Sequence, residues 1–367
     1  MRAVQDVFQI KGWELAEVGA PPRMRSWTLD PSDLSPGEVL VEVAGCGVCH
    51  TDLGFHYDGV RTKHPLPLIL GHEISGRVVA VSQSAAPWLD KSVVIPAVLP
   101  CGECEDCNSN RSNVCRSQMM PGNDIDGGFA SHIRVPSRWL VPIPESYGGE
   151  IALLSVVADA VSTPWQAILR AEVSEGDVAV IVGCGGVGGY CAQLARSQGA
   201  HVTCLDVSPA SLLSMTELGF EQVRDVSGES SREIRFWLRQ LASSEGWGGS
   251  GWKIFECSGN PSGQTLAFDL IGPSGTLAVV GFTMDKVSIR LSNLMAHDAK
   301  AFGNWGCQPE LYPQLLDRVL SGAVDLSATT EMRKLSEIED VFDSIHQGAG
   351  GKRVILVPDE SWKDEWQ

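Results

Sequence analysis

The sequence predicts a two-domain α/β protein, in which a largely β domain precedes a doubly wound domain built on a parallel sheet. The length of 367 residues exceeds that of one average domain. Short strand-like segments separated by turn residues dominate residues 1–155, and buried-strand patterns then alternate with helical patterns. These observations together favour two domains of different architecture.

Within residues 1–155, polar and apolar segments alternate between turn signals at residues 19–22 and 35–37. The run Glu38–Val43 has the period of two that is typical of a half-buried strand. Further short strands are predicted at residues 76–81, 92–95 and 129–135. The pattern indicates a largely β domain with long loops, without specifying a particular β fold.

The composition limits the classes of partner. The chain has 43% hydrophobic and 20% charged residues, which is typical of a folded protein and not of a disordered one. Its formal net charge of −17 argues against nucleic acid or an anionic membrane as a partner. Residues 1–10 do not resemble a signal peptide, and no apolar run reaches the length of a membrane span. We therefore expect a cytoplasmic protein.

Four cysteines form a compact array with the spacing C-x₂-C-x₂-C-x₇-C. Short spacings let successive thiolates converge on one tetrahedral ion, and four sulfur ligands exclude water from it. The intervening Gly, Glu, Asp and Asn residues are typical of a loop. A structural zinc site is predicted, with an iron–sulfur cluster as the alternative. Its ligands would be Cys101, Cys104, Cys107 and Cys115.

A second group of candidate ligands lies in the segments GCGVCHTD and LGHE. Cys49 and His72 supply a thiolate and an imidazole, which suit Zn²⁺, and a site with few protein ligands leaves a position for substrate. Thr51 adds a hydroxyl two residues after Cys49, while Asp52 and Glu73 place carboxylates beside the candidate ligands. The alternative is a pair of buried side chains that bind no metal.

The composition changes near residue 150. Residues 151–170 have a helical pattern that includes Asp159, a carboxylate within the apolar run VVADAV. Burying a carboxylate is costly unless it is paired or bound to a metal. Asp159 is therefore a third candidate ligand, with an ion pair or a helix cap as the alternatives.

The run Val178–Val182 predicts a buried parallel strand, and it leads directly into the sequence GCGGVGG. In this G-x-G-x-x-G motif the glycines permit a tight turn, and the N-terminus of the following helix can bind a pyrophosphate. The next strand, at residues 201–205, is followed by an acidic residue that would bind a ribose 2′-hydroxyl and repel a 2′-phosphate. We predict NAD, rather than NADP, at Gly183, Gly185, Gly186, Val187, Gly188 and Asp206.

The alternation continues through the rest of the chain. Helices are predicted near residues 210–218, 231–244, 263–270, 310–320 and 336–347. Strands are predicted at residues 221–226, 252–257, 276–282 and 353–357. Units of these lengths form a doubly wound sheet whose ligand crevice lies at the carboxyl ends of the strands.

Taken together, these motifs resemble those of the zinc-dependent medium-chain alcohol dehydrogenases over essentially the full length of the chain. The resemblance implies a GroES-like catalytic domain at residues 1–155, completed by about 308–367, and a Rossmann domain at residues 156–307. It implies NAD as the cofactor, with one catalytic and one structural zinc ion. It also implies a homodimer or homotetramer that pairs through a strand region at Val287–Met295.

Carried onto matching positions, the family pattern places the catalytic zinc on Cys49, His72 and Asp159, the last of which is a second cysteine in many members. Whether Glu73 also binds the metal stays open. The resemblance implies that Asp52 orients His72 and that Thr51 receives the proton of the substrate alcohol.

The same pattern assigns the proton relay and the cofactor contacts. Many members have a histidine five residues after the catalytic cysteine, whereas this chain has Gly54, so His56 or a water is the alternative relay. The positions Val280–Phe282 and Asn304–Gly306 would flank the nicotinamide. Cofactor contacts outside the glycine-rich loop would come from His50, Thr163, Ser258, Phe282 and Asn304.

Long stretches such as MMPGNDIDGGFASH and VVGFTMDKVSIRLSNLMA are similar to a subgroup that oxidises 6-hydroxycyclohex-1-ene-1-carbonyl-CoA to the 6-oxo thioester in anaerobic benzoyl-CoA degradation. An acyl-CoA substrate would need basic side chains that bind its phosphates. The alternative for each candidate basic residue is that it is an ordinary solvated surface cation. Two alternatives remain: a dehydrogenase for a cyclic or aryl alcohol without CoA, and a non-catalytic dinucleotide-binding protein, which would lack the catalytic ligands. The candidate cations are Arg23, Arg25, Arg61 and Lys63.

Overall fold

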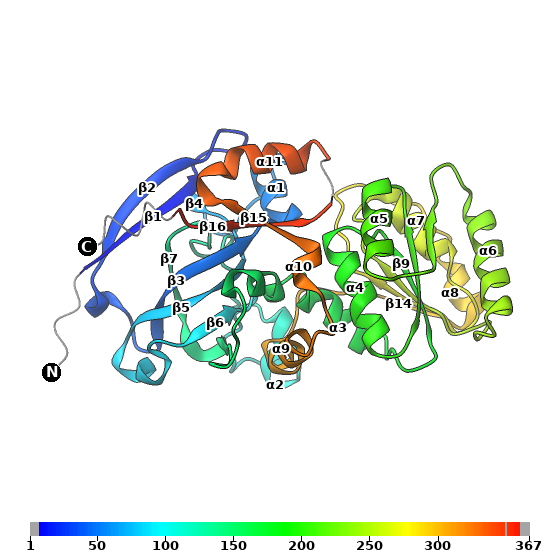
Figure 1. Ribbon diagram of the computed structural model, residues 1–367, viewed down its shortest axis with the longest axis horizontal. Helices are drawn as coiled ribbons and strands as arrows, with labels where there is room; N and C mark the ends of the chain where they lie inside the picture. The colour runs from blue at the N-terminus through cyan, green and yellow to red at the C-terminus, as the bar shows by residue number, and fades with distance from the viewer. Residues whose placement is uncertain (1–6, 349–350, 360–367) are drawn as a thin grey trace.

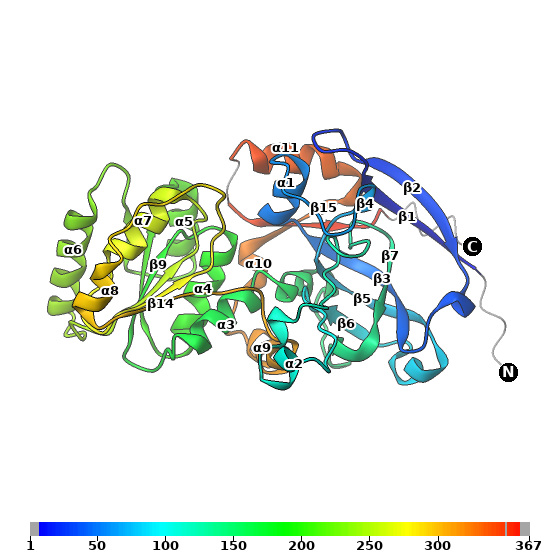
Figure 2. The same ribbon diagram turned by 180° about the vertical axis from the view of Figure 1, so that it is seen from behind.

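The computed structural model describes residues 7–348 and 351–359, and the molecule divides into two halves with separate β-sheets (Figure 1). Residues 1–6 lie outside the described residues, and they belong to the stretch in which no signal peptide is expected. Residues 360–367, at the end of the expected catalytic domain, also lie outside the described residues. Seen from behind, helices α2, α3 and α9 again lie together at the junction of the halves (Figure 2).

The first half contains a seven-stranded sheet and a three-stranded sheet. The larger sheet has the order β15-β16-β3-β5-β6-β8, with β7 also paired to β3, and the smaller has the order β2-β1-β4. Strand β16 pairs with β3 next to Cys46 and Gly47, so the C-terminal part of the chain returns to the first half. The strands are β1 (Phe8–Leu15), β2 (Arg23–Leu29), β3 (Glu38–Gly47), β4 (Leu68–Ile69), β5 (Glu73–Val81), β6 (Ser92–Ile95), β7 (His132–Pro136), β8 (Val141–Pro142), β15 (Thr330–Lys334) and β16 (Arg353–Val357).

Helices of the first half and of the junction are short. They are α1 (His50–His56), α2 (Glu105–Asn108), α3 (Ser162–Arg170), α9 (Tyr312–Leu320), α10 (Leu326–Thr329) and α11 (Ile338–His346). The 3₁₀ helices are η1 (Pro31–Asp33), η2 (Gln83–Trp88), η3 (Ser112–Val114), η4 (Ser137–Trp139), η5 (Ile151–Ala158), η6 (Pro309–Leu311) and η7 (Leu335–Glu337).

The second half is a parallel six-stranded sheet with the order β11-β10-β9-β12-β13-β14. The strand order reverses around β9, which makes its carboxyl end the point where such sheets bind ligands. Side chains of β9 alternate between two cores, with Val180 on one face and Ile181 on the other, so the predicted doubly wound sheet is confirmed. Its elements are β9 (Val178–Val182), α4 (Gly186–Ser197), β10 (His201–Asp206), α5 (Pro209–Glu217), β11 (Val223–Asp225), α6 (Ser231–Ser244), β12 (Lys253–Glu256), α7 (Pro261–Asp269), β13 (Thr276–Val279), α8 (Ser292–His297) and β14 (Lys300–Gly303).

Two predicted elements are wrong. The single helix predicted over residues 151–170 is divided into η5 and α3, because Asp159 leaves helical geometry with φ −143° and ψ −58°. The segment Val287–Met295 contains no strand in the described part of the chain, and α8 begins within it. Among the described residues β14 is the edge strand of its sheet and pairs with β13 alone, so the segment Val287–Met295 does not extend this sheet within the chain.

No single helix among the described residues is long and apolar enough to cross a membrane. The pair formed by η5 and α3, bent by 44°, meets the criteria of length and composition only when its two helices are joined. Most residues of this pair are buried in the protein core.

Candidate active site

Four potential ligand atoms lie within 4.8 Å of one another at the junction of the two halves, and they belong to Cys49, His72, Glu73 and Asp159. Cys49 is the N-cap of α1, His72 and Glu73 stand at the start of β5, and Asp159 lies in the break between η5 and α3. The side chain of Asp159 is 20% exposed, whereas the other three are buried. The fold thus brings three separate segments to one point that is accessible from the side of Asp159.

The surroundings of His72 fit a metal ion. Both ring nitrogens are buried without a hydrogen-bond partner, and Nε2 lies 3.5 Å from Asp159 Oδ2. Buried polar atoms without partners are rare and call for an explanation such as an ion. Sulfur, imidazole and carboxylate donors around one point are typical of a catalytic zinc site. Cys49, His72 and Asp159 are therefore the residues that would hold zinc.

Asp52 lies beside this centre and holds the backbone around it in place. Its fully buried carboxylate accepts hydrogen bonds from the backbone N–H groups of Cys49 at 2.9 Å and Gly71 at 3.1 Å, and Oδ1 lies 3.5 Å from His72 Nδ1. Burial alone would lower the pKa of His72, but the carboxylates of Asp52 and Asp159 raise it well above its ordinary value. The negative charge of the cluster thus favours a cation at this position.

Glu73 forms a buried ion pair with Arg353, the first residue of β16. The guanidinium donates to both carboxylate oxygens, from Nη2 to Oε1 and from Nε to Oε2 at 3.2 Å. Burial raises the pKa of Glu73 above its ordinary value, although Arg353 opposes this shift. Because both oxygens are engaged in this way, Glu73 serves as the anchor of Arg353 as well as a neighbour of the candidate metal ligands.

Arg353 also reaches the dinucleotide loop. A Cβ atom placed on Gly186 would lie only 3.2 Å from Arg353 Nη1, so the guanidinium lies beside the start of α4. Arg353 was not among the residues predicted from the sequence. Its only signal was a lone arginine at the beginning of the apolar run RVILV, and that pattern does not reveal the partner at Glu73.

Thr51 and His50 lie at the start of α1. Thr51 is half-buried, and its Oγ1 lies 3.6 Å from Cys49 Sγ, within reach of a group at the metal centre. His50 is exposed. Desolvation by neighbouring protein atoms, and then the Arg353 cation, lower the pKa of His50 below its ordinary value.

The structure does not bring His56 to the metal centre. Its ring packs edge-on against Tyr57 and Phe342, with centroids 4.2 Å and 5.6 Å away, in an apolar contact between α1 and α11. Cys49, at the N-terminal end of α1, belongs to the metal cluster, whereas His56, at its C-terminal end, contacts α11. This placement does not favour His56 as the proton relay.

The glycine-rich loop has the geometry that its sequence predicts. Gly183 has φ +87°, and a Cβ atom on Gly188 would lie 1.8 Å from the carbonyl oxygen of Gly183. A Cβ atom on Gly185, the N-cap of α4, would meet no protein atom within 4 Å. Gly188 is therefore needed by the turn itself, while the space at Gly185 is open to a ligand. Val187 follows in the first turn of α4.

Asp206 ends β10 and connects that strand to the loop. Its Oδ2 accepts from the backbone N–H of Cys184 at 2.5 Å, and its Oδ1 accepts from Val207 and Ser208 at 2.7 Å and 2.8 Å. A carboxylate offers about four acceptor positions. Asp206 therefore retains capacity for a further donor such as a ribose hydroxyl.

The remaining predicted cofactor residues surround the crevice. Thr163 donates its hydroxyl to Asp159 Oδ1 at 2.6 Å, and Asn304 donates Nδ2 to the carbonyl oxygen of Thr163 at 3.0 Å. Ser258 follows β12 and donates to a carboxylate of that strand, while Phe282 follows β13 and is 73% exposed. Three of these four residues follow neighbouring parallel strands, at the edge where doubly wound sheets bind ligands.

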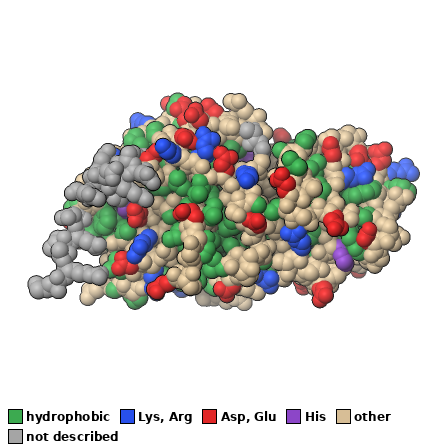
Figure 3. All heavy atoms as spheres, in the orientation of Figure 1, with side chains coloured by type: hydrophobic (Ala, Val, Ile, Leu, Met, Phe, Trp, Pro, Cys, Tyr) green, Lys and Arg blue, Asp and Glu red, His purple; other side chains and the backbone are tan. Residues whose placement is uncertain are grey.

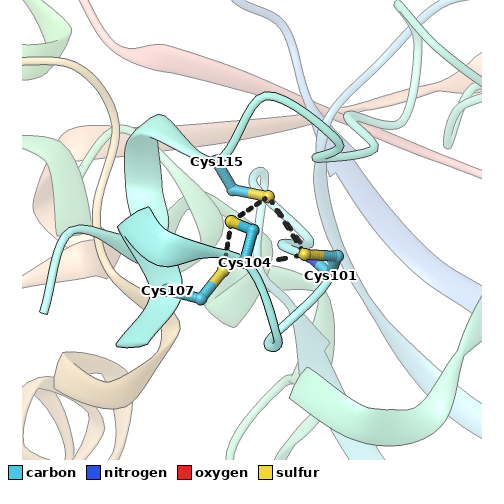
Figure 4. A group of neighbouring side chains, drawn as sticks. All are labelled: Cys101, Cys104, Cys107 and Cys115. Atoms are coloured by element: carbon cyan, nitrogen blue, oxygen red, sulfur yellow. Dashed lines mark hydrogen bonds between the residues drawn. The ribbon is translucent and has the colours of Figure 1, made fainter. Parts of the chain in front are cut away.

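The second cysteine cluster fits a closed tetrahedral site, as Figure 4 shows. All four thiols are free, and neighbouring sulfurs are separated by 3.5 to 3.9 Å. A zinc–sulfur bond of about 2.3 Å in a tetrahedron places sulfurs about 3.8 Å apart. The separations therefore match a four-sulfur site for structural zinc, formed by Cys101, Cys104, Cys107 and Cys115.

The comparisons with known proteins agree with this geometry. Residues 35–145 match the alcohol dehydrogenase GroES-like domain, and residues 186–321 match the zinc-binding dehydrogenase model. The chain is 27% identical over 337 residues to an alcohol dehydrogenase of Geobacillus stearothermophilus, covering 89% of this chain and 94% of that protein.

Solved structures are similar over almost the whole chain. The alcohol dehydrogenase of Aeropyrum pernix gives a TM-score of 0.83 at 25% identity, covering 95% of this chain and 100% of the other. Galactitol-1-phosphate dehydrogenase from Escherichia coli gives 0.84 at 24% identity, with the same coverage. The chain belongs to the zinc-dependent medium-chain alcohol dehydrogenase family, whose members are oxidoreductases acting on CH–OH groups, and the predicted family is thereby confirmed.

Two substitutions in the glycine-rich loop should separate folding from ligand binding. Gly188→Ala should lower the free energy of unfolding by about 1–3 kcal/mol, because its methyl group collides with a backbone carbonyl. Gly185→Ala should change it by less than about 0.5 kcal/mol, yet weaken binding of NADH. Urea unfolding and fluorescence titration with NADH measure the two effects. Equal losses of stability in both variants would contradict this assignment.

Removing Arg353 should leave a buried carboxylate without its partner. Arg353→Met should cost about 3–5 kcal/mol of stability at pH 7. In this variant the folded state holds a proton on Glu73 more tightly than the unfolded chain does, so the loss should shrink as the pH falls from 7 toward 5. Chemical unfolding at several pH values, beside the parent protein and the double variant Glu73→Gln with Arg353→Met, tests this. A loss independent of pH would exclude Glu73 as the titrating group.

Proposed function

We propose that this protein is an NAD-dependent dehydrogenase that oxidises a secondary alcohol at a zinc centre formed by Cys49, His72 and Asp159. The observation that supports the proposal most directly is the position of Arg353, which contacts Glu73 at this centre and lies beside Gly186 in the dinucleotide loop. Transfer of a hydride from a carbinol carbon to a nicotinamide requires both sites to face one space.

The surrounding residues can be given roles in this reaction. Zinc, when bound, acts as a Lewis acid that lowers the pKa of the alcohol hydroxyl. Thr51 takes up the released proton through its half-buried hydroxyl near Cys49, and Asp52 keeps His72 in a fixed orientation. Because Gly54 stands where many members have a histidine, the proton passes from Thr51 to solvent without a relay through His56.

NAD is the proposed cofactor because of Asp206. A carboxylate at the end of β10 would repel the 2′-phosphate of NADP, and no Lys or Arg follows it before Arg224. Placing like charges side by side costs several kcal/mol when they are shielded from water. The site should therefore prefer NAD, whose ribose has a free 2′-hydroxyl, over NADP.

For the substrate we propose 6-hydroxycyclohex-1-ene-1-carbonyl-CoA, which would be oxidised to the conjugated 6-oxo thioester in anaerobic benzoyl-CoA degradation. Support comes from the resemblance of long segments of this chain to dehydrogenases of that reaction, such as MMPGNDIDGGFASH. Conjugation of the new carbonyl with the ring double bond and the thioester would favour the product.

A cyclic or aryl alcohol without CoA is the second candidate, and the surface charges favour it. Arg23 and Arg25 both pair with Glu14, and Lys63 pairs with Asp124. Arg61 is therefore the one expected phosphate ligand for which no ion pair is found in the described part of the chain. Acidic and basic side chains are interspersed on the face shown in Figure 3. At Arg23, Arg25 and Lys63, CoA phosphates would compete with the carboxylates that already pair with these side chains.

A turnover assay decides between the two substrates. The zinc-loaded protein should reduce NAD⁺ with the CoA thioester at least about tenfold more efficiently than with the free acid or simple cyclohexenols, and should use NADP⁺ at least about tenfold less efficiently than NAD⁺. Nicotinamide absorbance follows the reaction. Equal turnover of the free alcohols would overturn the CoA assignment, whereas no turnover of any alcohol would overturn the proposed function.

We also propose that the protein self-associates through the region after β13. Five large apolar side chains there are between 43% and 78% exposed, next to the edge strand β14, and they are Phe282, Met284, Ile289, Leu291 and Met295. Extensive exposed apolar surface marks interaction sites, and these five side chains lie within one short stretch of the chain. Light scattering should give a dimer or tetramer, and Leu291→Asp with Met295→Asp should reduce it to a monomer. A monomeric parent protein at micromolar concentration would contradict this.

A further inference from the structure

The loop that carries the four cysteines is bonded directly to the segment that follows β14. All the lobe residues involved lie between the third and fourth cysteine, and Ser112 and Asn113 are buried. The hydrogen bonds run from Asn113 Nδ2 to the Trp305 carbonyl oxygen at 2.8 Å, from Ser112 Oγ to Glu310 Oε2 at 2.7 Å, and from Gln308 Nε2 to the Asn110 carbonyl oxygen.

The segment 304–308, which follows β14, is irregular in structure and is held largely by side-chain hydrogen bonds. Gln166 of α3 also donates to the carbonyl oxygen of Trp305, at 3.3 Å, and accepts from the backbone N–H of Gln308 at 2.9 Å. Arg170 donates to the carbonyl oxygen of Gly303 at 2.7 Å. The segment is therefore held between α3 and the cysteine lobe.

This segment is continuous with the active site. Asn304 donates to the carbonyl oxygen of Thr163, and the hydroxyl of Thr163 donates to Asp159 at the metal centre. A shift of the Trp305 backbone would therefore move Asn304, the residue expected beside the nicotinamide. The lobe fixes one end of this connection, because four ligands on one ion would leave residues 101–115 little freedom.

We propose that Asn113 is a positioning residue: it uses the cysteine lobe as a rigid support that holds Asn304 and Trp305 at the distance a bound nicotinamide requires. The proposal rests on the proposed function for the place of the nicotinamide. It gives the structural metal site a role in cofactor binding, in addition to its effect on stability. Asn113 itself touches neither substrate nor cofactor.

Substitution of Asn113 tests the proposal, with Asn108→Ala as the matched control. Asn108 belongs to the same lobe, but its Nδ2 donates to the carbonyl oxygen of Glu103, so its bond ends within the lobe. Loss of one buried hydrogen bond corresponds to a change of about threefold to tenfold in an equilibrium constant. Asn113→Ala should therefore raise the Kd for NADH by about that factor and lower kcat/KM for NAD⁺, while Asn108→Ala changes neither.

Zinc content and thermal unfolding show whether the lobe remains intact in each variant. Asn113→Ala should keep two zinc ions per chain, and Asn113→Asp, which cannot donate, should reproduce its loss of NADH affinity. An NADH affinity equal to that of the parent protein would overturn the proposal. If the parent protein itself binds no NADH, the proposed function fails instead.

Gln308→Ala decides the matter if both Asn113 variants lose zinc or unfold. Gln308 is half-buried, and its side chain makes the reverse bond to Asn110 while its backbone bond to Gln166 is retained. With the lobe loaded with zinc, Gln308→Ala should also weaken NADH binding. An unchanged Kd in this variant would overturn the proposal.

Discussion

The buried ion pair between Glu73 and Arg353 is the interaction on which the arrangement of both sites depends. It joins β5, which begins beside His72, to β16, the last strand of the first half, and it directs a guanidinium toward the glycine-rich loop. A buried pair is stable only with good geometry and further hydrogen bonds, and both oxygens of Glu73 are satisfied by Arg353. The contact also restricts its neighbours: a Cβ atom at residue 47 would lie 2.1 Å from Glu73 Oε2, so only glycine fits there.

Charge balance explains the composition of the metal centre. Asp52, Glu73 and Asp159 place three carboxylates close together beside Cys49, and negative charge shielded from water requires compensation. Arg353 supplies one positive charge, and the carboxylates of Asp52 and Asp159 also raise the pKa of His72 well above its ordinary value. A divalent metal ion held by these residues would supply the remaining positive charge. An aspartate and a thiolate carry the same charge, so Asp159 can replace the second cysteine of many family members without altering this balance. It differs in hydrogen bonding, because its second oxygen accepts from Thr163.

The local parts of this picture could be predicted from the sequence. The glycine-rich loop, the cysteine lobe and the strand Val178–Val182 are encoded within short stretches, so spacing and periodicity were sufficient. The role of Arg353 could not be predicted, because it depends on the ion pair with Glu73, which lies 280 residues away in the sequence. The break at Asp159 and the ion pairs of Arg23 and Arg25 likewise depend on distant neighbours. The domain boundaries at residues 155 and 307 remain predictions.

Anomalous scattering at the zinc edge from crystals grown with NADH would test the central claim, that a zinc centre and a dinucleotide site face one space. We expect two peaks per chain. One should lie about 2.0–2.3 Å from ligand atoms of Cys49, His72 and Asp159, with the nicotinamide between it and Asn304. The other should lie among the four cysteines of the lobe. A missing peak at Cys49, or a nicotinamide directed away from it, would contradict the account.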